Sequence, residues 1–291
     1  MSATASLPDQ GGPAAATPAI THFAGRAGDH NDRAMIASRL LAAALGERYG
    51  VAPAVVGAPR PALSTGWETE LDAAREELRL LAVHYDTLLA AGRRPVTALG
   101  RCAVALATLP AVAAHHPDAV VVWFDAHADL NTPQTTTTDF LGGLAFSGPL
   151  GLWDSGLGAG LATDHAVLVG ARDIDPAEQA LLDSTDIALV TPGPDLGERL
   201  RHVVAGRPVY VHIDCDVLEP GTVPTDYLVP DGLTLDDLHD AARALAESHV
   251  VGIEIGELES ETGEEDLTPL LSALSPLLDA VAAPPADEVV G

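Results

Sequence analysis

The sequence predicts an α/β fold in which helices cover both faces of a single parallel sheet. Short apolar runs alternate along the chain with segments of helical spacing, which is the pattern of consecutive β-α-β units. One run, Val120 to Phe124, is apolar at every position, as in a strand that is buried on both faces. Acidic residues directly follow several of these runs, and the carboxyl edge of a parallel sheet is where such folds bind ligands.

The individual elements follow from the apolar runs and their boundaries. These runs predict eight strands, over residues 19–23, 52–57, 96–99, 120–124, 166–170, 187–190, 209–213 and 250–255. Apolar residues at helical spacing predict helices over 31–49, 69–91 and 101–114. The Thr- and Gly-rich stretch 131–160 is too long for a simple connection, so we expect an active-site loop there.

Composition bounds the class of protein. The 291 residues are 47% hydrophobic, enough to bury the core of one large domain, which we place at 19–281. Residues 1–18 predict a disordered leader without the character of a signal peptide, and 282–291 predict a flexible tail. The net charge of -27 argues against nucleic acid or an anionic membrane as a partner, and no apolar stretch is long enough to span a bilayer. We therefore expect a cytoplasmic protein, and two cysteines indicate no disulfide framework.

Two clusters of potential metal ligands follow predicted strands. Asp125, His127 and Asp129 alternate after the fourth strand, and Asp214 and Asp216 follow the seventh. The first cluster alone is more often a polar exit from a strand, although its donors suit Mn²⁺ and can hold Zn²⁺ or Fe²⁺. Two strand ends with alternating acids would repel each other strongly unless a cation lay between them. The two clusters together therefore predict a metal centre. Their five ligands are too many for one ion that must also leave room for substrate.

Four sequence motifs carry a resemblance to a known family. They are DAHADLNTPQTTTT (125–138), GARDIDPAE (170–178), HIDCDVLEP (212–220) and GIEIGELE (252–259). The chain resembles the ureohydrolase family, which comprises arginases, agmatinases and formimidoylglutamases, over roughly residues 19–278. The resemblance implies a three-layer α/β/α sandwich around a parallel sheet of eight strands. It also implies a homo-oligomer, either a trimer or a hexamer.

The resemblance further implies a pair of Mn²⁺ ions bridged by a hydroxide. Carried onto this chain, Asp125 and Asp214 would bridge the ions. Asp129 would complete the site of one ion, and His127 and Asp216 that of the other. Hydroxide formed at neutral pH would attack the guanidinium carbon of the substrate, and the intermediate would collapse to an amine and urea.

The resemblance also implies how the substrate is held. Glu257, which we expect to be catalytic together with Asp129, would hold the guanidinium through paired charge-assisted hydrogen bonds. The groups expected to bind the amino-acid end are Asn131, Thr136 and Thr138 for the α-carboxylate, and Asp175 with Glu178 behind it for the α-ammonium. Their presence favours an arginine-like amino acid over agmatine, which has no carboxylate.

The chain departs from the family at one metal position. Where the family usually has Gly-Gly-Asp-His, this chain has Leu99-Gly100-Arg101-Cys102, so that Cys102 takes the place of a histidine ligand. A cysteine in an apolar helix is more often part of the core. Its place at a strand end beside two acid clusters favours a ligand instead, and a thiolate makes Zn²⁺ or Fe²⁺ competitive with Mn²⁺. The sequence offers no account of Arg101.

A second departure concerns the substrate. Gly142 stands where arginases have a histidine that shuttles protons. Some family members with cysteine at the metal position act on Nω-hydroxy-L-arginine in antibiotic biosynthesis, and an N-hydroxyguanidine is less basic than a guanidine. We therefore expect Nω-hydroxy-L-arginine, or L-arginine, as the substrate. The alternative is a catalytically silent member that binds guanidino compounds or a partner protein.

Overall fold

A single all-parallel sheet organises the protein, as the computed structural model of residues 17–283 shows. Its eight strands are β1 (Ala19–Phe23), β2 (Ala54–Val56), β3 (Pro95–Ala98), β4 (Val120–Phe124), β5 (Ala166–Val169), β6 (Ala188–Val190), β7 (Val209–Asp214) and β8 (Val250–Gly256). They lie in the order β2-β1-β3-β8-β7-β4-β5-β6, and every neighbouring pair is parallel. The predicted fold class is confirmed.

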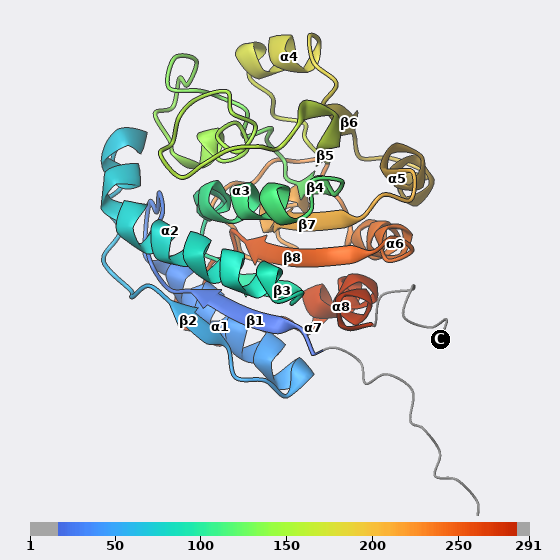
Figure 1. Ribbon diagram of the computed structural model, residues 1–291, viewed down its shortest axis with the longest axis horizontal. Helices are drawn as coiled ribbons and strands as arrows, with labels where there is room; N and C mark the ends of the chain where they lie inside the picture. The colour runs from blue at the N-terminus through green and yellow to red at the C-terminus, as the bar shows by residue number, and fades with distance from the viewer. Residues whose placement is uncertain (1–16, 284–291) are drawn as a thin grey trace, which may run out of the picture.

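Helices cover both faces of the sheet (Figure 1). They are α1 (Arg33–Tyr49), α2 (Trp67–Ala90), α3 (Ala105–His115), α4 (Pro176–Leu182), α5 (Leu196–Val204), α6 (Leu235–Leu245), α7 (Thr268–Ala273) and α8 (Ser275–Ala282). Short 3₁₀ turns add η1 (Cys102–Val104), η2 (Gly142–Leu144), η3 (Thr163–His165) and η4 (Cys215–Val217).

The alternation of side chains along the strands divides the interior into two cores. In β4, Val120, Val122 and Phe124 pack into the core formed with α1, α5, α6, α7 and α8. Val121 and Trp123 point to the other face and pack with α2, α3 and the loop around Phe146. Because successive residues of a strand face opposite sides, a strand apolar at every position supplies both cores at once.

The predicted elements match the observed ones closely, and the ends differ for local reasons. Each predicted strand lies within two residues of the observed one at either end. The predicted helix over 101–114 begins as the 3₁₀ turn η1 before α3. α1 ends where predicted, at Gly50, whose φ of 64° lets its backbone N–H bond the last carbonyls of the helix. The loop 131–160 contains η2 and anchors itself in the core through Leu141 and Phe146.

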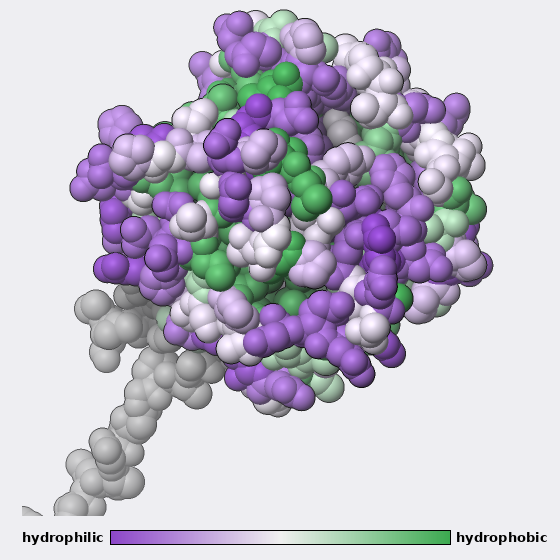
Figure 2. All heavy atoms as spheres, turned by 180° about the vertical axis from the view of Figure 1, so that it is seen from behind, coloured by the Kyte–Doolittle hydropathy of each residue, from purple (hydrophilic) through white to green (hydrophobic). Residues whose placement is uncertain are grey.

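The predicted leader and tail fall largely outside the described residues. Of these two segments, the structure describes 17, 18, 282 and 283 alone, and α8 continues through Ala282. Within residues 17–283, no helix has the length and apolar character needed to cross a membrane. Seen from behind, polar side chains cover most of the surface, with apolar ones showing between them (Figure 2).

The topology places the predicted functional groups together. β3, β8, β7 and β4 are consecutive neighbours in the middle of the sheet. Their carboxyl ends lead directly into Cys102, Glu257, Asp214 and Asp125, respectively. Four segments far apart in sequence therefore meet at one edge, as expected for ligand sites in parallel sheets.

Candidate active site

The two acid clusters predicted from sequence form one continuous group. His127 links them, because its Nδ1 lies 3.2 Å from Asp125 Oδ1 and 3.2 Å from Asp216 Oδ2. Backbone N–H groups hold the carboxylates against the strand ends: His127 N donates to Asp125 Oδ1 at 2.6 Å, and Asp216 N donates to Asp214 Oδ1 at 2.7 Å. Trp123 Nε1 donates to the other oxygen of Asp125 at 2.9 Å. The acids are thus fixed in place by the chain itself.

The electrostatics of this group are those of crowded, buried carboxylates. Burial and the charge of Asp125 raise the pKa of Asp129 well above its ordinary value, and burial and Asp216 do the same for Asp214. Burial and Asp125 also raise the pKa of Asp216, to about 6. Burial lowers the pKa of His127, but hydrogen bonds to Asp125 and Asp216 outweigh it and raise that pKa to about 12.

The donors of this group fit a pair of divalent cations. Ligand atoms lie within 4.8 Å of one another in three sets, which are Cys102–Asp125–Asp129, Cys102–Asp214–Glu257 and Asp125–His127–Asp216. The first and third sets share Asp125, so a carboxylate at that position can face two ions. Oxygen, imidazole and sulfur donors are compatible with manganese, zinc or iron.

Cys102 lies in the apolar core, but its sulfur faces the polar group. Sγ is 3.1 Å from Asp214 Oδ2 and 3.0 Å from His212 Nε2. Burial and the nearby acids raise the pKa of the thiol well above its ordinary value, so in the protein alone it donates a hydrogen bond to Asp214. His212 in turn stacks on Trp123 and has Nδ1 2.7 Å from Glu254 Oε1. The position is therefore more than a packed core site.

A cavity of about 180 Å³ opens over this group. Its wall includes ten of the predicted site residues. Seven of them stand at or shortly after the ends of strands: Cys102, His127, Asp129, Asn131, Asp214, Asp216 and Glu257. Asp129 and Glu257 both have left-handed backbones, with φ of 53° and 61°. Non-glycine residues in this region cost free energy, and active sites are among the places where such strain clusters.

The wall of the cavity also holds most of the residues expected to bind an amino acid. Asn131 Nδ2 donates to Asp175 Oδ2 at 2.9 Å, and both line the cavity with Thr138 and Glu178. Glu178 accepts from Asp175 N at 2.9 Å and from Leu130 N at 2.9 Å, which ties the start of α4 to the loop after β4.

Thr136 is the exception among these residues. It does not line the cavity, and its Oγ1 accepts a hydrogen bond from Asp139 N at 3.1 Å within the loop.

Two aromatic side chains that the sequence did not single out also line the cavity. A Cβ at Gly142 would lie 2.5 Å from Cε1 of Phe140, so the Phe140 ring occupies the space that a larger residue at 142 would need. The Tyr227 ring lies 5.2 Å from that of His127. Phe140 could have been found from its place beside Gly142, whereas Tyr227 belongs to a loop without a recognisable motif.

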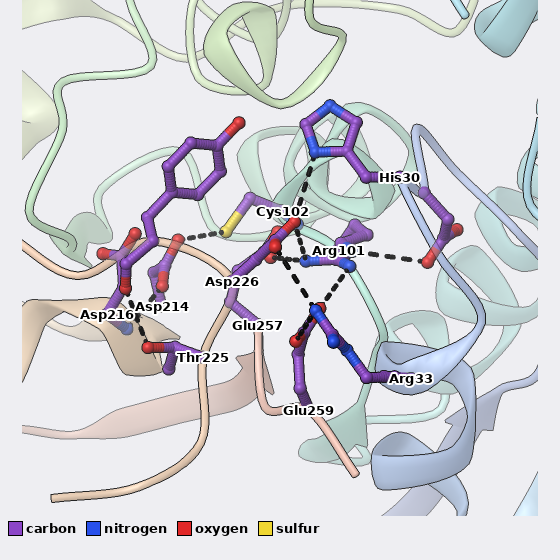
Figure 3. A network of polar contacts seen from close by, with 12 residues as sticks. His30, Arg33, Arg101, Cys102, Asp214, Asp216, Thr225, Asp226, Glu257 and Glu259 are labelled. Carbon is purple, nitrogen blue, oxygen red and sulfur yellow. Dashed lines mark hydrogen bonds and ion pairs between the residues drawn. The ribbon is translucent and has the colours of Figure 1, made fainter. Parts of the chain in front are cut away.

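Arg101 is the centre of a second polar network beside the cavity (Figure 3). Its side chain is fully buried, and Nη1 donates to Glu257 Oε2 at 2.8 Å while Nη2 donates to Glu259 Oε1 at 2.8 Å. Nε lies 3.4 Å from Asp29 Oδ1. The charge of these acids outweighs burial and raises the pKa of the guanidinium, so it stays charged. The structure thereby supplies the account of Arg101 that the sequence lacked.

Comparison with known proteins agrees with this fold. The arginase family model matches residues 56–274. Arginase from Bacillus subtilis superposes with a TM-score of 0.74 at 20% identity, covering 89% of this chain and 98% of that one. The chain belongs to the arginase family, and it is a hydrolase that acts on amidines.

Within the family, one curated relative is similar over most of its length. The N(omega)-hydroxy-L-arginine amidinohydrolase of Streptomyces lavendulae is 42% identical over 248 residues, which are 84% of this chain and 91% of that protein. An arginase of Schizosaccharomyces pombe is 32% identical over 188 residues, 57% of each chain.

Proposed function

We propose that this protein hydrolyses the guanidino group of Nω-hydroxy-L-arginine to ornithine and hydroxyurea, and that L-arginine is the poorer substrate. The observation that carries the proposal is the meeting of Glu257 and residues of both acid clusters in one cavity, whose wall also includes Asn131 and Asp175. The similarity to an N(omega)-hydroxy-L-arginine amidinohydrolase supports the choice of substrate. We also propose a role in antibiotic biosynthesis, which the resemblance of the sequence to family members with cysteine at the metal position implies.

The metal ligands that we propose follow the sets of adjacent donors. Cys102, Asp125 and Asp129 would hold one ion, and Asp125, His127 and Asp216 the other, with Asp214 beside Cys102 as a further ligand. We propose two Mn²⁺ ions per subunit, with Zn²⁺ or Fe²⁺ competing because Cys102 is a soft donor. When bound, the pair of ions would lower the pKa of a water molecule and so supply a hydroxide nucleophile at neutral pH.

The chain's own residues orient the substrate and move its protons. The carboxylate of Glu257 would bind the guanidino N–H groups, since it lines the cavity and is held rigidly by Cys102 N and Arg101. We assign proton transfer to the leaving amine to Asp129, because its carboxylate faces the cavity and position 142 has no side chain. Asn131, Thr138 and Asp175 would bind the amino-acid end, with Glu178 holding Asp175 in place and Thr136 supporting the loop.

The test is product release from the Mn²⁺-loaded protein with Nω-hydroxy-L-arginine and L-arginine side by side, and with agmatine as the control that lacks a carboxylate. We expect ornithine and hydroxyurea from the first, slower release from the second and none from the third. Asp175→Ala should raise KM for the amino acids by about tenfold and leave the metal content unchanged.

Other results would redirect the assignment. A preference for L-arginine would make the protein an arginase in activity. Two bound metal ions with no release from any substrate would point to a silent member of the family that binds guanidino compounds.

A further inference from the structure

Arg101 presents a permanent positive charge to the residue that is proposed to hold the substrate. Its Nη1 donates to Glu257 Oε2 at 2.8 Å, and neither side chain is more than 5% exposed. Resting on the proposed function, we infer that Arg101 makes the site select a weakly basic guanidine. It does so by positioning Glu257 and by disfavouring a second full positive charge on the same carboxylate.

The carboxylate of Glu257 accepts hydrogen bonds from two groups of the protein, which limits how many more it can accept from a ligand. Arg101 occupies one position on Oε2, and the backbone N–H of Cys102 donates to Oε1 at 2.8 Å. Each carboxylate oxygen can accept about two hydrogen bonds, so one position on each oxygen remains for a ligand. A guanidino group bound there would share its carboxylate with the guanidinium of Arg101.

The charges around Glu257 are partly balanced by the chain itself. Arg33 Nη2 lies 2.7 Å from Glu259 Oε2, so that Arg33 and Arg101 share the carboxylate of Glu259 (Figure 3). Both arginines also lie 3.6 Å from the carboxylate of Asp226. The two guanidinium groups thus offset half of the charge of the four surrounding acids, the fourth being Asp29. Like charges that share a buried carboxylate repel each other strongly. A positively charged ligand on Glu257 therefore gains less binding free energy than it would without Arg101.

A hydroxyl group on the guanidine changes this balance. Oxygen withdraws electrons from the guanidine nitrogens, so an N-hydroxyguanidine gives up its proton near neutral pH at little cost, whereas an alkylguanidine does not. The neutral form still donates N–H groups to Glu257 and adds no charge beside Arg101. The repulsive contact therefore acts on L-arginine and spares Nω-hydroxy-L-arginine, which is how specificity between close analogues is commonly achieved.

Ligand binding to the full-length protein tests this selection. Affinities for the two amino acids would be measured by calorimetry after removal of metal with a chelator, which prevents turnover. Arg101→Met removes the charge. The double variant Arg101→Met/Glu259→Gln also removes one of the acids that Arg101 balances, which offsets part of the loss of stability. We expect the preference for hydroxyarginine to fall at least tenfold in both variants, through tighter binding of L-arginine relative to hydroxyarginine. Arg101→Lys keeps the charge and should stay within about threefold of the wild-type ratio.

Proton release separates selection from a merely structural role. Calorimetry in two buffers of different ionisation enthalpy should show about one proton released per hydroxyarginine bound at pH 7, and none for L-arginine. The release should decrease in Arg101→Met. An unchanged ratio and unchanged proton release in both Met variants would overturn the inference. So would a wild-type protein that binds the two ligands equally or binds neither.

The proposed function can fail separately. If the metal-loaded protein hydrolyses neither amino acid while the metal-free protein binds them as expected, the assigned reaction is wrong and selection by Arg101 stands.

Discussion

Two buried groups of acids lie next to each other at the carboxyl edge of the sheet, and they differ in their source of positive charge. In the group of Asp125, Asp129, Asp214 and Asp216, His127 pairs with Asp125 and Asp216, and within residues 17–283 no arginine side chain forms an ion pair with any of the four acids. Glu257 and Glu259 surround Arg101 instead. We propose that the first group takes its cations from solution, whereas the second is completed by the chain. We refer to them as the metal group and the Arg101 group.

The largest effect should come from breaking the metal group. Asp125→Ala removes the carboxylate common to both proposed ion sites, so we expect turnover to fall at least about a thousandfold and metal content to drop below two ions per chain. Metal analysis and hydroxyarginine hydrolysis measure this. Glu259→Gln is the matched control, because it changes an acid of the Arg101 group and should leave the metal content at its wild-type level. Full turnover by Asp125→Ala would contradict the proposal that two ion sites share this carboxylate.

In the absence of metal, a substitution in one group and a substitution in the other should change the free energy of unfolding differently. Arg101→Met leaves Glu257 and Glu259 without their buried partner, which should cost about 3–5 kcal/mol in the free energy of unfolding. Asp129→Asn removes one of several repelling carboxylates and should be neutral or stabilise by about 1 kcal/mol. Urea unfolding with a chelator present gives both values. Equal destabilisation by the two substitutions would remove the distinction that we draw.

The pH dependence of stability should carry a signature of the Arg101 group. Burial raises the pKa of Asp29 from 3.8 to about 6, and the nearby Arg101 offsets only part of this effect. Because folded protein binds more protons than unfolded protein between these values, this residue contributes stability below about pH 4 that is lost as the pH rises to 6. The contribution is about 2–3 kcal/mol. Asp29→Asn should flatten that slope relative to wild type when unfolding is followed from pH 4 to 7, and parallel curves would contradict it.

The smallest expected effect concerns the preference of the metal group for one metal ion over another, which depends on whether residue 102 offers a sulfur or a nitrogen donor. Cys102→His replaces a thiolate with an imidazole and should raise Mn²⁺ affinity about tenfold relative to Zn²⁺ affinity. Competitive metal binding at fixed pH measures the ratio. Cys215→Ala is the control, since Cys215 packs in the apolar core on the other side of β7 and should change neither affinity. If Cys102→His leaves the ratio unchanged, Cys102 is not a metal ligand.

The metal group was predictable from sequence, and the Arg101 group was not. Asp125 and Asp214 stand at the ends of largely apolar runs that predict buried strands, and parallel pairing of those strands brings them to one edge. Arg101 lies 72 residues from Asp29 and 158 from Glu259 along the chain, and no local pattern connects them. Their contact depends on how the loops after β1 and β8 fold over the strand ends. That is a property of tertiary packing.

Some of the residues that line the cavity could likewise be predicted from sequence, and others could not. Asn131, Thr138 and Asp175 belong to motifs, and the structure places them in the wall. Phe140 and Tyr227 reach the cavity through loop conformation, which a residue's type does not determine. Thr136 belongs to a motif yet turns into its own loop, because a backbone N–H three residues on takes its hydroxyl as acceptor.

The left-handed backbone at Glu257 bears on any effort to make this protein more robust. A glycine there would relieve roughly 1–2 kcal/mol of backbone cost, since glycine adopts positive φ freely. It would also delete the carboxylate that faces the cavity. The same substitution would break the buried ion pair with Arg101, and the loss of that pair costs more than the backbone relief. A library screened for heat resistance without a turnover assay would therefore tend to keep this carboxylate, because the side chain that faces the cavity also balances the charge of Arg101.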